Sequence, residues 1–342
     1  MNPRPPLRPR ATGRVTLADV ARAAEVSPIT ASRALSGKRA VAEELVDRVK
    51  AAAQRLGYVP DPAARALASR HSTHVAVLIP MLTNALFVDL LEAAQRTLRH
   101  AGFQSLIGIT HYVPAEEEQL LREQLVHRPA GLLVTGWQHT ESTRAMIAAS
   151  GVPCVHLMEL ADDPAGYSVG FSQVQAGAAM TRHLLGRGRR RIAFAAAQLD
   201  ARTLQRMEGW RREMSIAGLY DPALEWMNPA PSSQALGARM FAQIIGQTPP
   251  LDAIFFCNDD LAQGALLAAA RSGISVPRQV AVAGFNDLPG SDQMIPPLTT
   301  VNTPRAQVGE TAAAMLLRLI RGEPVPEPRV DLGFSIVVRE ST

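Results

Sequence analysis

The sequence predicts an α/β protein that combines an N-terminal three-helix helix-turn-helix domain with a two-lobed body built on two parallel sheets. Three observations lead to this prediction. Residues 1–70 hold 13 Lys and Arg against 6 Asp and Glu, whereas the rest of the 342-residue chain holds 22 against 25. Signals for short helices fill the basic part, and apolar strands alternate with helices in the remainder. The length favours about two domains, at roughly 150 residues each.

Composition narrows the class of protein. Hydrophobic residues make up 47% of the chain, which suits a sizeable core and excludes a disordered protein. The longest apolar stretch, 75–82, is far shorter than the roughly 18 residues of a membrane span, so we expect no membrane partner. Cys154 and Cys257 are too few for a disulfide framework, and the basic start leads into no apolar segment typical of a secretory signal. We therefore expect a cytoplasmic protein whose basic part binds nucleic acid.

The sequence of the basic part, residues 1–70, predicts three short helices. Thr16 and Ser27 have hydroxyl side chains suited to cap the first two helices, and Gly57 is placed to end the third. Two short helices joined by a tight turn, with a third packed behind, are the plan of a helix-turn-helix, whose second helix enters the major groove of DNA. Arg33, on that helix, can form a bidentate contact with guanine. On the helices alone, an ordinary three-helix packing module is the alternative.

The body predicts two lobes. From residue 74, strands alternate with helices, which is typical of parallel sheets. The first series has strands near 75–79, 103–107, 131–134 and 152–157, and the second starts at Val169 and includes 191–196, 253–257 and 280–284. Two series of about 100 residues favour two lobes with a ligand cleft, which the carboxyl ends of the strands should face.

Three segments carry a resemblance to a known family. The runs TLADVA at 16–21, VSPITASRAL at 26–35 and LGYVP at 56–60 resemble the lactose-repressor (LacI/GalR) family of bacterial regulators, and the resemblance extends from about residue 15 to the end. The chain departs from the family pattern at Glu25, where Gly is usual, and at Ala42, where a Ser commonly caps the third helix. A left-handed backbone at Glu25 would cost on the order of 1 kcal/mol.

The resemblance implies a domain plan. We expect a disordered basic tail over 1–13, a helix-turn-helix DNA-binding domain over 14–60, a hinge helix over 61–71 and a periplasmic-binding-protein-like effector-binding and dimerisation domain over 72–342. The N-lobe would take about 72–165 and 297–328, and the C-lobe about 166–296 and 329–342. In the family the hinge orders on DNA, where a leucine at the position of Leu67 wedges between base pairs in the minor groove. A plain interdomain linker is the alternative. The DNA-binding residues that we expect are Thr16, Ser27, Pro28, Ile29, Thr30, Ser32, Arg33, Tyr58, Arg65 and Leu67.

The resemblance also implies an effector site in the cleft. Arg206 matches the family's effector-binding arginine, and Arg202, four residues earlier, would share its helix face. Two guanidiniums on one wall favour an anionic ligand. Alternatively, Arg202 forms only a surface ion pair and Asp259 only caps a helix. The effector-binding residues that we expect are Phe87, Arg202, Arg206, Phe256, Asn258, Asp259 and Asn286.

Four segments of the two-lobed part of the chain are similar in sequence to the gluconate-repressor branch of the family. They are 169–171, 199–203, 256–262 and 331–334. This similarity implies a repressor whose affinity for DNA is controlled by a sugar acid. Gluconate is the first choice, and 2-ketogluconate, another aldonate or a neutral sugar are the alternatives. One helix-turn-helix binds one half-site, so we expect a homodimer on a near-palindromic operator. The chain ends soon after residue 338, which leaves no room for the leucine-repeat helix that forms tetramers in the family.

Motifs of enzymes are absent from the sequence. A Walker A motif needs Ser or Thr after its Lys, but Lys38 is followed by Arg39, and no HExxH, CxxC or GxSxG motif occurs. Asp259 and Asp260 are adjacent, so on one helix they point in different directions, which disfavours a two-carboxylate hydrolase. We therefore expect no catalytic residues, no cofactor and no metal. A sugar-binding protein or an enzyme without a DNA role is the distant alternative.

Overall fold

The computed structural model describes residues 15–37, 41–59, 72–83, 85–246 and 250–342. The chain divides into two compact units, Met1–His71 and Ser72–Thr342, and each is described by itself. The predicted tail and the predicted hinge, with Arg65 and Leu67, lie outside the described residues.

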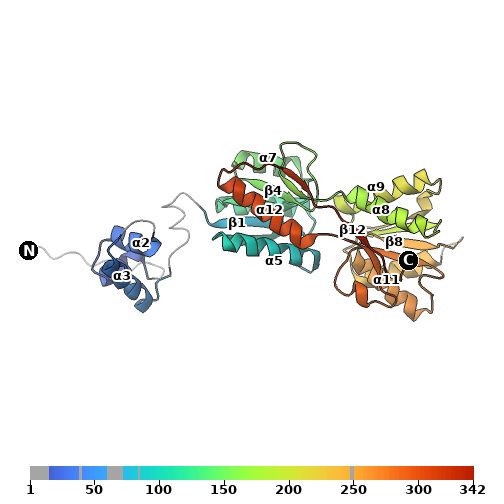
Figure 1. Ribbon diagram of the computed structural model, residues 1–342, viewed down its shortest axis with the longest axis horizontal. Coiled ribbons are helices and arrows are strands. Elements are labelled where there is room, and N and C mark those ends of the chain that lie inside the picture. Colours follow the sequence, from blue (N-terminus) through green and yellow to red (C-terminus); the bar gives the residue numbers. More distant parts are fainter. Residues whose placement is uncertain (1–14, 38–40, 60–71, 84, 247–249) are drawn as a thin grey trace, which may run out of the picture. The chain divides into compact units, whose positions relative to one another are not determined.

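The described residues of the first unit form three helices around a core of small residues. Thr16 caps the first helix through a reciprocal pair of bonds with Asp19, and Ser27 caps the second by accepting from the Thr30 amide at 3.1 Å. Glu25 has a φ of 53°, so the left-handed backbone expected at this turn is present. Ala42 precedes the third helix and supplies no side-chain cap. The helices are α1 (Leu17–Ala23), α2 (Pro28–Ser36) and α3 (Glu43–Arg55) (Figure 1).

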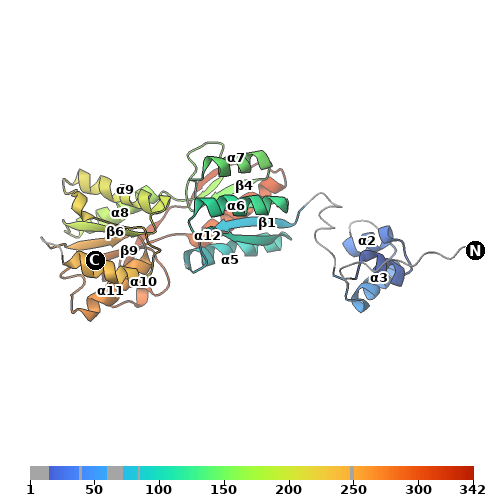
Figure 2. The same ribbon diagram turned by 180° about the vertical axis from the view of Figure 1, so that it is seen from behind.

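The N-lobe of the second unit is a six-stranded parallel sheet with helices on both faces (Figures 1 and 2). Alternation along β1 explains the layers: Val75 and Val77 pack in the same core as α5 and α12, whereas Ala76 and Leu78 pack with residues of α6 and α7. The strands, in sheet order, are β11 (Arg329–Asp331), β5 (Ser168–Gly170), β4 (Cys154–Leu157), β3 (Gly131–Thr135), β1 (His74–Ile79) and β2 (Gln104–Ile109). The helices are α5 (Ala85–His100), α6 (Pro114–Val126), α7 (Glu141–Ser150) and α12 (Arg305–Ile320).

The C-lobe repeats this plan with one antiparallel edge strand, β12. Helices α8 and α9 pack tightly against each other, because a Cβ at Gly177 would collide with the backbone of Arg206 and one at Gly209 with that of Val174. The strands, in sheet order, are β12 (Ser335–Val337), β10 (Thr299–Asn302), β9 (Ala281–Asn286), β8 (Ala253–Phe256), β6 (Ile192–Ala197) and β7 (Glu225–Asn228). The helices are α8 (Gln173–Gly186), α9 (Ala201–Ile216), η1 (Pro222–Leu224), α10 (Gln234–Ile245), α11 (Asp259–Arg271) and η2 (Ser291–Gln293).

The chain crosses between the lobes later than the sequence predicted. Val169 lies in β5, which pairs with β4 of the N-lobe and does not open the C-lobe series. Likewise β10 joins the C-lobe sheet before the chain returns to the N-lobe in α12, and β11 pairs with β5 before β12 pairs with β10. Strands of three or four residues carry too little periodicity to indicate which sheet they join.

Candidate functional site

The first turns of α2 present an exposed face in the first unit. Ile29, Ser32 and Arg33 are exposed, and their spacing of three and four residues places them on one side of the helix. The side chain of Ile29 is 65% exposed and adds an apolar group to this face. This face therefore offers one apolar, one hydroxyl and one guanidinium group together.

The other described residues of the predicted DNA interface have structural partners. The hydroxyls of Ser27 and Thr30 lie 2.8 Å apart at the start of α2, where Pro28 is also exposed. Thr16 donates its hydroxyl to Asp19 at 2.7 Å, and the half-buried Tyr58 packs against the small core.

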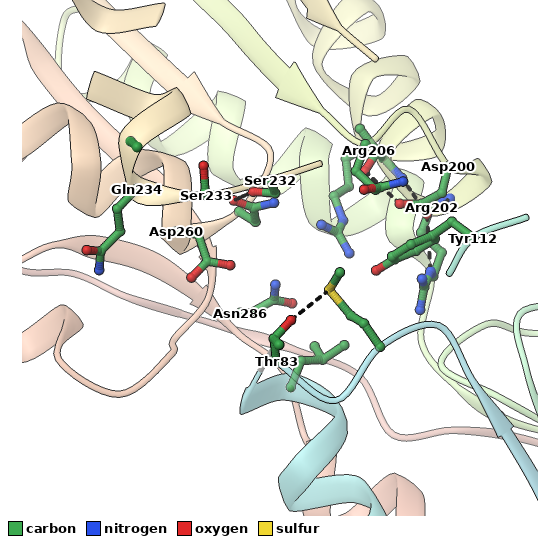
Figure 3. Close-up of a pocket in the computed structure, with 16 residues that line it drawn as sticks. Thr83, Tyr112, Asp200, Arg202, Arg206, Ser232, Ser233, Gln234, Asp260 and Asn286 are labelled. Atoms are coloured by element: carbon green, nitrogen blue, oxygen red, sulfur yellow. Dashed lines mark hydrogen bonds and ion pairs between the residues drawn. The ribbon is translucent and has the colours of Figure 1, made fainter. Parts of the chain in front are cut away.

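A cavity of about 490 Å³ opens between the two lobes of the second unit (Figure 3). Most of its walls are residues that follow strand ends of the two parallel sheets, as expected for ligand sites in α/β proteins. The N-lobe contributes Met81, Thr83, Leu86 and Tyr112. The C-lobe contributes Gln198, Asp200, Arg202, Thr203, Arg206, Ser232, Ser233, Gln234, Ala235, Asn258, Asp260 and Asn286.

Arg206 is a buried cation on the wall formed by α9. Its Nε donates to Oε1 of Gln173 at 2.8 Å, and its Nη1 donates to the carbonyl oxygen of Cys257 at 2.6 Å. The guanidinium carbon lies 3.9 Å from the centre of the Phe285 ring. Burial lowers the pKa of Arg206, but a guanidinium remains charged in proteins. A charge held in this way on a cavity wall is suited to bind an anion.

Arg202 lies on the same wall but is already paired. Its Nε lies 3.3 Å from Oδ1 of Asp200, the residue that caps α9. Burial acts to lower the pKa of Arg202, but Asp200, Tyr112 and Glu159 together outweigh it, so that the pKa lies above its usual value. The guanidinium also lies 5.5 and 5.8 Å from the ring centres of Phe87 and Tyr112. The pair with Asp200 is therefore a buried one at the cavity, and it balances the charge of Arg202.

Tyr112 is a wall residue that the sequence analysis did not identify. It follows β2, and both His111 and Tyr112 have left-handed backbone, with φ of 48° and 60°. This turn places the Tyr112 ring beside Arg202 (Figure 3). Burial raises the pKa of Tyr112 to about 12, so its hydroxyl is neutral at physiological pH. Its place after a strand end was the available signal, because the same signal identified Asn258 and Asn286.

The opposite end of the cavity carries hydroxyl, amide and carboxyl groups. Ser232, Ser233, Gln234 and Asp260 lie together there, away from the two arginines (Figure 3). Burial raises the pKa of Asp260. The cavity is thus polar along its length, with a cationic end and a neutral-to-acidic end.

Two asparagines, Asn258 and Asn286, also line the C-lobe side of the cavity. Asn258 accepts from the Leu261 amide at 3.1 Å and from the Ser232 hydroxyl at 3.0 Å, so it caps α11 and lines the cavity at once. Asn286 has a φ of 110°, and its buried Oδ1 has no hydrogen-bond partner among the described residues. A buried acceptor without a partner costs free energy, so a ligand that donates to Asn286 would gain from it.

Three of the predicted effector residues do not line the cavity. Phe87 is fully buried beneath Arg202, and Phe256 is fully buried in the C-lobe sheet. Asp259 is also fully buried, and its carboxylate accepts hydrogen bonds from Thr300, the Leu288 amide and Ser291. These bonds tie α11 to the segment after β9 and to β10. The neighbouring Asp260 faces the cavity instead.

The described part of the chain contains no group of three or more His, Cys, Asp and Glu side chains placed to hold a metal ion. Among the helices within it, none is long and apolar enough to cross a membrane.

Comparisons with known proteins cover both units. Residues 16–61 match the family model described as bacterial regulatory proteins, lacI family, and residues 181–342 match the periplasmic binding protein-like domain. The HTH-type transcriptional regulator GntR of Pseudomonas aeruginosa is 56% identical over 97% of each chain. Among solved structures, transcription regulator GntR from Chromobacterium violaceum is 48% identical with a TM-score of 0.77, over 78% of this chain and 98% of that one. The lac repressor dimer bound to operator and the anti-inducer ONPF is 26% identical with a TM-score of 0.84, over 96% and 99%.

Proposed function

The chain belongs to the LacI family of bacterial regulatory proteins, and on this premise we propose that it is a homodimeric repressor whose operator affinity is controlled by a sugar acid bound at Arg206. It is a DNA-binding transcriptional regulator, as its relatives are, and those relatives are not enzymes. The single observation that carries the effector class is the buried guanidinium of Arg206 on the wall of a polar cavity.

Operator contact is assigned to the exposed face of α2. Ile29, Ser32 and Arg33 are placed to meet base edges, while Thr16, Ser27, Pro28, Thr30 and Tyr58 would orient the unit on the DNA backbone. A similar chain has been solved as a dimer bound to operator, which supports a near-palindromic site and a two-fold partner. In the hinge, Arg65 would contact phosphate and Leu67 would wedge between base pairs.

Arg33→Ala tests the DNA assignment. The probe is an operator selected from random duplexes by the wild-type chain, compared with a duplex of unrelated sequence. Loss of a bidentate guanine contact should weaken operator binding roughly 10- to 100-fold and leave binding to the unrelated duplex nearly unchanged. The control is Arg48→Ala, which makes the same charge change at an exposed position on α3. It should lower the affinity for the operator and for the unrelated duplex equally, or leave both affinities unchanged. Equal losses for Arg33→Ala would assign Arg33 to phosphate contact alone.

The cavity suits a sugar acid, and gluconate is the member of that class that we propose. Its carboxylate suits Arg206, which has no carboxylate of the described residues at ion-pair distance, and its hydroxyls suit the serines, amides and Asp260 that follow along the cavity. The volume lies within the range of ~300–1,000 Å³ that is usual for small-molecule sites. The same argument admits 2-ketogluconate and other aldonates, whereas a neutral hexose would leave the Arg206 charge without a partner.

Calorimetric titration of the full chain with gluconate, 2-ketogluconate, glucose and galactose tests the effector. We expect micromolar binding of a sugar acid alone, lost in Arg206→Met. Arg212→Met, a half-exposed arginine on the same helix, is the matched control and should bind as the wild type does. Binding of a neutral hexose with no binding of an acid would overturn the effector class and leave the regulator class standing.

A further inference from the structure

The two guanidiniums of the cavity are held by different kinds of partner. Arg202 pairs with the carboxylate of Asp200, whereas Arg206 is bonded by an amide oxygen and a backbone carbonyl, which are both neutral. Asp200 acts on Arg206 at longer range, but no carboxylate of the described residues lies within ion-pair distance of it. Of the two cations, Arg206 is therefore the one whose charge is available to a ligand.

The neutral amide belongs to Gln173, the first residue of α8. Its side chain is almost fully buried, with Oε1 accepting from Arg206 and Nε2 donating to the Met158 carbonyl at 3.0 Å. This orientation of the amide is the one that chemistry requires, because a guanidinium only donates and a carbonyl only accepts. A carboxylate at this position would neutralise Arg206 and repel the Met158 carbonyl, and an apolar side chain would leave Nε of Arg206 without an acceptor.

Met158 directly follows β4, so Gln173 also connects Arg206 to the N-lobe. The N-terminus of α8 is fixed by Ser172, whose hydroxyl accepts from the Gln175 amide at 3.2 Å. Gln173 is thus held at its backbone by a helix cap and at its amide by two different lobes.

We infer that Gln173 is a positioning residue that sets the charge specificity of the cavity. As a neutral acceptor it orients Arg206 and leaves the guanidinium charge for one carboxylate of the ligand. The inference rests on the proposed function, because it assumes that the sugar acid meets Arg206. It explains how a cavity with two arginines and two aspartates favours an acid with one carboxylate over a neutral ligand.

The test compares gluconate with gluconamide, its neutral isostere, on Gln173→Glu. This variant retains the acceptor oxygen and adds the neutralising charge. We expect gluconate affinity to fall roughly tenfold or more while gluconamide affinity is unchanged, so that the preference for the acid collapses. Gln175→Glu makes the same charge change at an exposed position two residues along and should leave both affinities as in the wild type.

Gln173→Met separates positioning from charge. It removes the acceptor without adding a charge, so we expect a fall in gluconate affinity of roughly three- to tenfold with the preference for the acid retained. Circular dichroism and melting midpoints verify that each variant is folded; should Gln173→Glu not fold, an unchanged gluconate affinity in folded Gln173→Met overturns the inference. A folded Gln173→Glu that retains the wild-type preference also overturns it. A wild-type chain that binds no sugar acid overturns the proposed effector, and the role of Gln173 with it.

Discussion

The side-chain amide of Gln205 donates a hydrogen bond of 2.7 Å to the carboxylate of Glu159. Gln205 lies on α9 of the C-lobe, and Glu159 follows β4 of the N-lobe. The second carboxylate oxygen accepts from the Trp137 amide at 3.1 Å, and Glu159 is buried. Together with the bond from Gln173 to Met158, this contact ties two helices of the C-lobe to one strand end of the N-lobe.

The bond between Glu159 and Gln205 should be measurable as a coupling free energy. Glu159→Ala should lower the free energy of unfolding by about 1–3 kcal/mol, because it leaves two half-buried donors, the Gln205 side-chain amide and the Trp137 backbone amide, without an acceptor. In a double-mutant cycle with Gln205→Ala, the two losses should fall short of additivity by on the order of 1 kcal/mol, measured by denaturant unfolding. The exposed pair of Glu118 and Arg122 on α6 is the control, with a coupling of about 0.5 kcal/mol or less. Additive losses at Glu159 and Gln205 would mean that the bond does not hold the lobes together.

Asp259 should prove structural. Its carboxylate accepts from three donors and does not face the cavity. Asp259→Asn replaces one acceptor oxygen by a donor that meets other donors, so the free energy of unfolding should fall by roughly 1–3 kcal/mol. Gluconate affinity of the folded variant should equal that of the wild type in calorimetry. A tenfold loss of affinity in a folded variant would return Asp259 to the effector site.

The elements with local signals were the ones that the sequence predicted well. The family, the α/β class and the helix-turn-helix are confirmed, since caps such as Thr16 and Ser27 and the proline at the start of α2 act within a few residues. The exchange of strands between the lobes was not predictable, because β5 and β11 join the N-lobe sheet through pairing with residues far away in the chain.

In the candidate site, too, features with local sequence signals were predicted and features set by distant contacts were not. Of the residues that the sequence analysis expected to bind an effector, Arg202, Arg206, Asn258 and Asn286 line the cavity. The sequence could not tell Asp259 from Asp260, because the rotation of α11 about its axis decides which of the two carboxylates faces the cavity. Nor could it supply the neutral partners of Arg206, which are set by the packing of α8 on α9.

The buried environment of His156 predicts that the stability of the folded chain depends on pH. Its Nδ1 lies 3.0 Å from the Gly136 carbonyl and 3.2 Å from Nε2 of His139, and burial together with His139 lowers its pKa to about 4. The unfolded chain therefore binds a proton more readily than the folded chain does. The stabilisation is complete above the unfolded pKa of 6.5 and is lost as the pH falls towards 4, by at most about 3 kcal/mol.

His156→Gln removes this titration. The variant should lose less of its free energy of unfolding than the wild type between about pH 7 and pH 4.5, measured by urea unfolding at each pH. His100→Gln, at an exposed position at the end of α5, is the control and should follow the wild-type curve. If the free energies of unfolding of His156→Gln and the wild type fall in parallel as the pH is lowered, another group causes the loss of stability in acid.

Glu25 stores backbone strain in the turn before α2. Its φ of 53° is a conformation that glycine adopts freely and other residues disfavour. Glu25→Gly should therefore stabilise the first unit by roughly 1 kcal/mol, less the entropy that glycine adds to the unfolded chain. Glu44→Gly makes the same substitution in the first turn of α3, where it removes a helix-forming residue and a favourable negative charge and should destabilise by up to roughly 1 kcal/mol. Hydrogen exchange of the α2 and α3 amides in the full chain measures both, and slower exchange in Glu25→Gly with faster exchange in Glu44→Gly is the expected pair of results. Faster exchange in both variants would mean that the Glu25 side chain contributes more to the turn than its backbone costs.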